Sequence, residues 1–293
     1  MKLLSVCPLL AAFAFAMPAS ADTPEPLWTL STSGSWFEIS SSDRDAVSVS
    51  VSLSRTVGEG AVGASLGTSN GSDALFDETE ITDRSSVFGS IWASVPVGAA
   101  YVDLSVSLSQ DDYDGDVVIE DSRFDYLNGS GVSLVSDVDT VSVAAAVSRV
   151  YYSGDWDIIP NASVGWSQSD STTSATSLAD AVAPIAIKEE QSGVMASAGL
   201  GIGYVANDRL YLYSDLVGLY AENGAATGTV SSSRTGNLRS NSRQDADESL
   251  WAEVSFGASL YATDTVTLSL SGGTTAGRDD EEVFASSSLS VNF

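Results

Sequence analysis

Apolar and polar residues alternate one by one over many stretches of this chain. An apolar residue stands at every second position in Val47–Leu53, Val102–Leu108 and Val266–Leu270, with Ser, Thr or Asp between. Side chains two positions apart lie on the same face of a β-strand, so each stretch predicts a strand with one apolar and one polar face. The many Val and Thr residues favour strands as well.

Twelve such segments are predicted along the chain: 27–40, 45–56, 60–69, 84–96, 98–110, 139–152, 156–169, 190–205, 208–221, 247–262, 265–277 and 282–293. The first is the least regular, because Trp36-Phe37 breaks its alternation, and we expect a β-bulge there. No run of 18 apolar residues follows residue 21, so no membrane-spanning helix is expected.

The links between these segments alternate in length. Five short turns are expected, at 57–59, 96–97, 153–155, 206–207 and 263–264. Six other links, most of them long and polar, fall at 41–44, 70–83, 111–138, 170–189, 222–246 and 278–281. Short periplasmic turns on one side and longer outer loops on the other are typical of membrane barrels. The predicted fold is therefore all-β, a transmembrane antiparallel up-and-down β-barrel of about 12 strands.

The first 21 residues have the pattern of a secretory signal peptide. Lys2 is followed by the apolar stretch Leu3–Met17 and by the small-residue site Ala19-Ser20-Ala21. This stretch is too short to span a membrane as a helix. We expect export through the Sec pathway, cleavage after Ala21, and one barrel domain over residues 22–293.

Composition excludes several kinds of chemistry. The chain has 293 residues, with 12 Lys+Arg against 39 Asp+Glu, a net charge of -27 and no histidine. An acidic chain is not a nucleic-acid binder, and the missing histidine removes the commonest general base and metal ligand. The single cysteine is Cys7, inside the predicted signal peptide. We therefore expect no enzyme activity, no cofactor and no nucleic-acid partner.

The last segment indicates where the protein resides. Val283, Ala285, Leu289, Val291 and Phe293 share one face of the predicted strand, with Ser and Asn on the other. An apolar-alternating final strand that ends in Phe resembles the recognition signal of bacterial outer-membrane barrels, with Leu289, Val291 and Phe293 as the assembly signal. In length and strand count the chain resembles an autotransporter β-domain. The resemblance implies the cell outer membrane of a Gram-negative bacterium, with outer-membrane lipid and the barrel assembly machinery as partners. Only Asp22–Pro26 precede the first strand, so no passenger domain or pore helix is expected.

Aromatic residues gather near the short turns. Nine of them lie within about five residues of a turn and are expected to form the periplasmic interface girdle: Trp92, Tyr101, Tyr151, Tyr152, Trp156, Tyr204, Tyr211, Tyr213 and Tyr261. A soluble β-sandwich would also alternate, but its loops would not sort by length in this way.

Three motifs invite a chemical interpretation. Gly63–Gly67 matches G-x-S-x-G, but it lies on a predicted strand and lacks a histidine base, so barrel-wall residues are expected. Gly199, Gly201 and Gly203 alternate on one strand face and are expected to make room for a neighbouring bulky side chain. The acidic run Asp111–Asp116 resembles part of a calcium loop, but with Gln110 at its first position it is expected to be a solvated outer loop. Divalent binding by the acidic loops stays open.

Charged residues on the predicted strands suggest the character of the lumen. Four carboxylates alternate with outward apolar residues on their strands, so they are expected to point inward: Asp103, Asp157, Asp215 and Glu253. An acidic lumen would favour cations, although the whole chain is acidic. A structural or surface-interaction role, or a narrow pore, is the expected function. A small porin-like channel for neutral or cationic solutes is the alternative. The surface ligand, the oligomeric state and the direction of loops 111–138 and 222–246 stay open.

Overall fold

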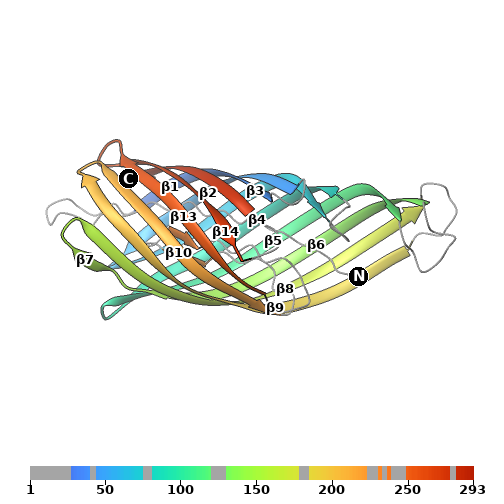
Figure 1. Cartoon of the computed structure of the whole chain (residues 1–293), viewed down its shortest axis with the longest axis horizontal. Coiled ribbons are helices and arrows are strands. Elements are labelled where there is room, and N and C mark those ends of the chain that lie inside the picture. Colours follow the sequence, from blue (N-terminus) through green and yellow to red (C-terminus); the bar gives the residue numbers. More distant parts are fainter. Residues whose placement is uncertain are drawn as a thin grey trace.

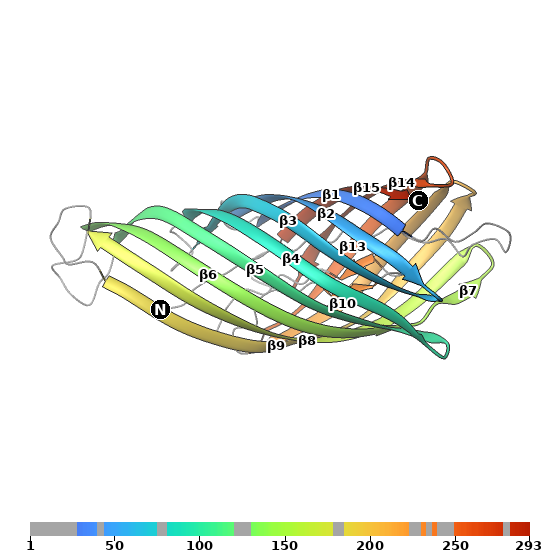
Figure 2. The ribbon, with the colours of Figure 1, turned by 180° about the vertical axis from the view of Figure 1, so that it is seen from behind.

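The computed structural model describes residues 28–39, 44–74, 81–119, 130–177, 185–222, 230–232, 236–238, 249–277 and 282–293. Twelve antiparallel strands close into one barrel, with β1 paired to β15 (Figures 1 and 2). The predicted fold class is confirmed. Within these ranges no helix is long and apolar enough to cross a membrane. The predicted signal peptide lies outside the described residues.

The strands follow one another around the barrel in chain order. They are β1 (Trp28–Ile39), β2 (Arg44–Val57), β3 (Gly60–Ala74), β4 (Ile81–Val97), β5 (Ala100–Ile119), β6 (Ser130–Ser148), β7 (Tyr151–Ser153), β8 (Trp156–Ser177), β9 (Ile185–Asn207), β10 (Leu210–Glu222), β13 (Ser249–Tyr261), β14 (Val266–Ala276) and β15 (Glu282–Asn292). The short β7 continues β6 along the edge of β8, so the two count as one wall strand. A separate hairpin pairs β11 (Val230–Ser232) with β12 (Gly236–Leu238).

The predicted bulge at Trp36-Phe37 is wrong. β1 pairs in unbroken register with both β2 and β15. Trp36 is 37% exposed, whereas Phe37 is 3% exposed on the opposite face. Two adjacent aromatic residues therefore need no bulge, because one faces outward and the other into the barrel. A register shift lies instead between Leu210 and Tyr211, at the start of β10.

Four neighbouring strands are much longer than their apolar patterns suggest. β5, β6, β8 and β9 have 20, 19, 22 and 23 residues and extend beyond the shorter strands at one end of the barrel (Figures 1 and 2). The expected outer loop 111–138 is largely strand, since β5 and β6 stay paired out to Ile119 and Ser130. Much of 170–189 is strand as well. The ladder continues there because backbone hydrogen bonds do not require apolar side chains.

The short turns all lie at the opposite end, which we call the short-turn end. Gly58 and Gly154 adopt φ values of +61° and +63°, the left-handed region that a tight turn between strands requires. Two predicted turns are displaced by two residues: the chain turns at 98–99 and 208–209, after Val97 and Asn207. We call the other end, which carries the longer links, the loop end.

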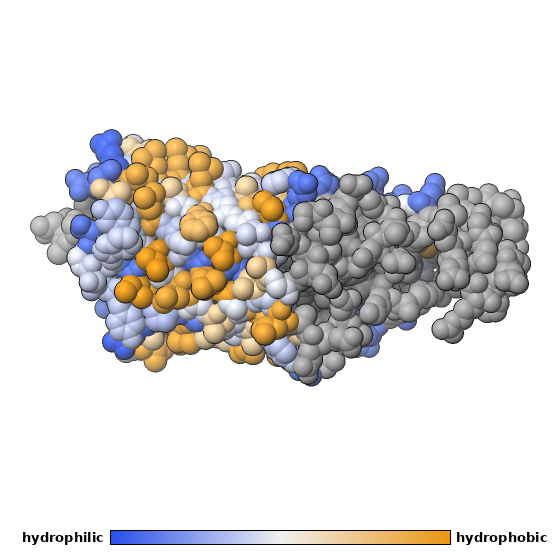
Figure 3. Space-filling model, viewed as in Figure 1, coloured by the Kyte–Doolittle hydropathy of each residue, from blue (hydrophilic) through white to orange (hydrophobic). Residues whose placement is uncertain are grey.

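The two faces of the barrel wall differ as alternation predicts. Val49 is 55% exposed on the outside, and its neighbour Ser50 is 3% exposed on the inside. In Figure 3 apolar side chains gather on the outer surface over the strands labelled β10, β13 and β14 in Figure 1. On β5 this outward apolar band ends at Leu108, beyond which the outward residues are polar. An apolar band around a closed barrel is the geometry of a membrane-spanning β-barrel.

Candidate functional site in the barrel lumen

Paired hydroxyl groups line much of the lumen wall. The serines of β1, β2 and β15 alternate inward, and directly opposed hydroxyls pair across strands. The pairs are Ser31 with Ser290, Ser33 with Ser50, Ser35 with Ser48, Ser65 with Ser90, Ser136 with Thr173, Thr140 with Ser169, Ser163 with Ser197, Ser259 with Ser269, and Ser271 with Ser286. Each pair satisfies two polar groups within the wall, so these rows form a smooth, uncharged lining.

Inward aromatic rings lie over glycines of the next strand. A Cβ on Gly203 would meet the ring and hydroxyl of Tyr211, and a Cβ on Gly257 would meet Tyr213. A Cβ on Gly63 would lie 2.6 Å from the Trp92 ring. The prediction that the β9 glycines accept bulky neighbours is confirmed. These glycines therefore hold the rings against the wall rather than across the centre of the lumen.

The predicted aromatic girdle is only partly correct. Tyr151, Trp156 and Tyr204 lie on the outer face near the short turns, with the Trp156 and Tyr204 rings 4.7 Å apart, whereas Tyr152 is opposite the inward Asp157 in the β7–β8 register. The other five face the lumen: Trp92, Tyr101, Tyr211, Tyr213 and Tyr261. The face on which a side chain lies depends on its place in the one-by-one alternation along the strand, and its distance from a turn does not decide it. Leu210 and Leu212 occupy the outward positions on either side of Tyr211, so Tyr211 itself points inward.

The structure places all four predicted lumen carboxylates on the inner face. Asp103 and Glu253 are 2% and 7% exposed, and Asp157 and Asp215 are half-buried. Tyr211 donates a hydrogen bond of 3.1 Å from its hydroxyl to the Asp157 carboxylate. Asp157 and Asp215 lie on β8 and β10, on either side of β9, so they share one part of the wall near the short-turn end.

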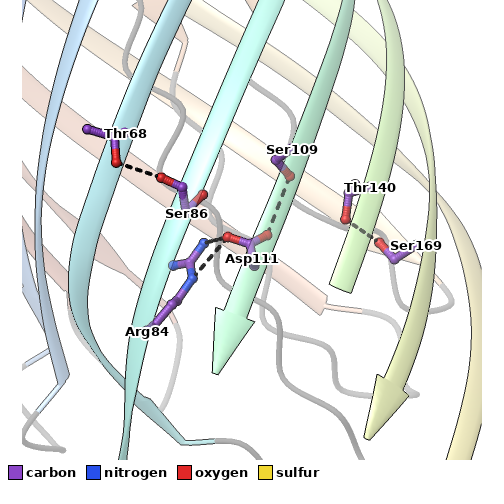
Figure 4. Close-up of polar contacts among 7 residues, drawn as sticks. All are labelled: Thr68, Arg84, Ser86, Ser109, Asp111, Thr140 and Ser169. Atoms are coloured by element: carbon purple, nitrogen blue, oxygen red, sulfur yellow. Dashed lines mark hydrogen bonds and ion pairs between the residues drawn. The ribbon is translucent and has the colours of Figure 1, made fainter. Parts of the chain in front are cut away.

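Sequence reasoning missed a buried ion pair in the lumen. Arg84 on β4 donates to Asp111 on β5 through Nη2 at 2.6 Å and through Nε at 3.2 Å (Figure 4). The guanidinium also lies 5.8 Å from the centre of the Tyr113 ring. Asp111 belongs to the run interpreted as an outer loop. The segment 111–116 is part of β5, with Asp111 inward and its neighbour Asp112 outward, so the expectation of a solvated outer loop there is wrong.

Exposed carboxylates gather on the outer face of the extended wall. Asp112 lies directly opposite Asp137, and Asp139 lies opposite Asp170, all of them beyond the apolar band. Partial burial, and next the negative charge of Asp137, raise the pKa of Asp112 above its ordinary value. Within the described ranges no group of three His, Cys, Asp or Glu side chains is arranged to hold a metal ion.

The β11–β12 hairpin folds inward at the loop end. It belongs to the link between β10 and β13, yet β11 contacts β5 and β6 on another side of the barrel. On the outer parts of these two strands the inward residues Asp111 and Ser136 are 0% exposed, whereas Asp112 and Asp137 on the outer face are exposed. For the described residues 230–232 of the 222–246 link, the contact therefore falls on the inner face of the wall.

Comparisons with known proteins support the fold. Neither a family model nor a curated protein matches this chain. The translocator domain of autotransporter NalP from Neisseria meningitidis is similar, with a TM-score of 0.70 and 9% identity over 92% of this chain and 89% of that one. The β-domain of the Bordetella autotransporter BrkA has a TM-score of 0.65 and 13% identity over 92% of this chain and all of that one. The CymD monoaromatic hydrocarbon channel has a TM-score of 0.50 and 11% identity over 92% and 89%. The chain thus has the barrel architecture of autotransporter translocator domains.

Proposed function

We propose that this protein is an outer-membrane barrel with a structural or surface-interaction role, whose lumen is at most a narrow pore. One observation carries the proposal. At the loop end the inward side chains Asp111, Tyr113 and Ser136 of β5 and β6 are at most 1% exposed, and β11 lies against these strands. A wide aqueous channel would leave such side chains exposed.

The membrane location rests on several supports. The outward apolar band and the closure of β1 on β15 suit a bilayer, where open strand edges are not tolerated. The N-terminal pattern implies Sec export with cleavage after Ala21. The likeness to autotransporter translocator domains agrees with an outer membrane, its lipids and its assembly machinery as the surroundings of this barrel. The polar extension of β5, β6, β8 and β9 would then stand above the lipid.

A second candidate is a narrow channel for cations or neutral solutes. It is favoured by the inward carboxylates of Asp157 and Asp215 and by the hydroxyl lining of the wall. In this case the hairpin would restrict the channel without closing it.

Conductance in planar bilayers tests the proposal. The full chain is compared with a variant in which Val230–Leu238 is replaced by a Gly-Ser segment of equal length. We expect rare or very small current steps from the full chain and clear steps from the variant. A Gly-Ser replacement of the 262–265 turn is the matched control and should behave as the full chain. Large, stable steps from the unmodified protein would reject the structural role and favour the channel.

A further inference from the structure

The inner face of β9 carries a stripe of three glycines with oxygen atoms gathered over it. Gly199, Gly201 and Gly203 alternate along the strand, so the stripe offers no side chains of its own. A Cβ on Gly199 would lie 3.0 Å from Asn161 Oδ1, and a Cβ on Gly201 would lie 2.6 Å from Asp215 Oδ1. These two oxygens come from strands on either side of β9 and lie above successive inward positions, about 7 Å apart along the strand.

A third oxygen group lies at the end of the stripe nearest the short turns. Asp157 is opposite Gly203 in the β8–β9 register, and its carboxylate accepts the hydrogen bond from the Tyr211 hydroxyl. The Tyr211 ring, which lies over Gly203, stands next to it, and the Tyr213 ring over Gly257 on β13 has its centre 6.3 Å from that of Tyr211. The stripe is therefore bordered by two carboxylates, one amide oxygen and the ring of Tyr211.

The charges and acceptors at this stripe are incompletely satisfied by the protein. Asn161 is 7% exposed, yet its Oδ1 has no hydrogen-bond partner among the described residues. No hydrogen bond or ion pair reaches Asp215 from the described part of the chain. A described cation does face the lumen at Arg84, but it is paired with Asp111 on β5. A half-buried carboxylate and a buried acceptor without donors are both costly, and a donor with positive charge would satisfy both.

We propose that this stripe binds a primary alkylammonium group. An ammonium carries a positive charge and N–H donors, which suit the Asp215 carboxylate and the Asn161 oxygen at neighbouring inward positions, while Asp157 adds negative charge at the end of the stripe. Its neighbouring CH₂ groups would pack against the Tyr211 ring, whose face also attracts cations. Ca²⁺ needs six to eight converging oxygens, whereas the oxygens here are spread over successive rows of the wall. The site would belong to the second candidate function, the narrow cation channel, and a role of the site in transport rests on that function.

The test measures binding to the folded protein in neutral detergent micelles by ligand-observed saturation-transfer NMR. The probe is butylammonium chloride in about 0.3 M NaCl, which screens the general attraction of an acidic chain. Butanol is the uncharged counterpart. We expect saturable binding of butylammonium and none of butanol. Saturable binding of butanol with equal affinity would overturn the site, since it would show partition into the barrel or the micelle.

Three variants locate the binding. Asp215→Asn should weaken butylammonium binding by about tenfold or more, because it removes a half-buried charge partner. Asn161→Leu should weaken it by about threefold, because it removes one acceptor. Asp103→Asn is the matched control, an inward carboxylate near the same end but on β5, and should change the affinity less than twofold. A gel shift between unheated and boiled samples confirms that each variant is folded.

Two further outcomes decide against the site. Equal losses in Asp215→Asn and Asp103→Asn would show that the lumen attracts cations without a defined site. Ca²⁺ binding that depends on Asp215, with no butylammonium binding, would identify a metal site instead. Because the assay uses protein in micelles, it is independent of conductance. Binding without current would reject the channel and keep the site, whereas cation-selective current without binding would reject the site alone.

Discussion

Trp28 and Phe293 join the first and last strands of the barrel through a pair of backbone hydrogen bonds. The Trp28 backbone N–H donates to the Phe293 carbonyl at 3.1 Å, and the Phe293 N–H donates back to the Trp28 carbonyl at 2.9 Å. The Phe293 side chain is 66% exposed on the outer face, at the short-turn end of β15. The last residue of the chain thus completes the β1–β15 seam, which removes the open edges of the sheet.

We predict that Phe293→Asp strongly reduces the amount of this protein in the outer membrane. The substitution removes about 2 kcal/mol of apolar burial in lipid, which would not unfold a finished barrel of this size. A severe loss would therefore reflect failed assembly. Immunoblots of membrane fractions measure the level, with Phe293→Tyr as the control that keeps an aromatic end. Normal levels of the Asp variant would refute the role of the terminal strand.

The ring of Tyr211 over Gly203 predicts a specific steric effect. Gly203→Ala would place a Cβ on the Tyr211 ring and hydroxyl, and forcing the ring away should cost about 1–3 kcal/mol of stability. Gly218→Ala is the control, because the nearest atom to its Cβ is a carbonyl oxygen 3.8 Å away. Urea unfolding in lipid vesicles measures both variants. Adding Tyr211→Ala should recover part of the loss in Gly203→Ala, and an additive loss would contradict the contact.

The Arg84–Asp111 pair should respond asymmetrically to substitution. Arg84→Leu leaves the 0% exposed Asp111 carboxylate with a Ser109 hydroxyl at 3.4 Å. Removing one partner of a buried pair costs about 3–5 kcal/mol. The double variant Arg84→Leu/Asp111→Leu should regain most of this stability. Arg209→Leu, at an exposed turn position, should change the free energy of unfolding by less than about 0.5 kcal/mol. If Arg84→Leu and the double variant lost a similar free energy of unfolding, Arg84 and Asp111 would not stabilise each other.

Repulsion between Asp112 and Asp137 predicts a pH-dependent effect. The folded-state pKa of Asp112 lies above its ordinary value of 3.8, so its ionisation reduces stability as the pH rises from about 3.8 through the folded pKa. Asp137→Asn should therefore stabilise the barrel at neutral pH by a few tenths of a kcal/mol, and the gain should vanish in acid. Asp116→Asn, opposite Ser133 in the register, is the control without a facing carboxylate. A gain from Asp137→Asn that persists at pH 3 would contradict an electrostatic cause.

The sequence by itself determined the number of strands and the face on which most side chains lie. Alternation around Val49 or Asp103 is a local property, because successive side chains of any strand point to opposite sides. The same alternation assigns the rings of Tyr211 and Tyr213 to the lumen. The sequence prediction placed them in the interface girdle because they lie near a turn.

Only the tertiary structure decided which residues meet across the strands. The contacts of Tyr211 with Gly203, of Arg84 with Asp111 and of Asp112 with Asp137 depend on the register, which the ladder and the closure of the barrel set together. The lengths of β5 and β8 were also hidden, because their outer parts pair through the backbone although both faces are largely polar. The inward path of the β11–β12 hairpin depends on a contact with strands distant in sequence, so no local pattern encodes it.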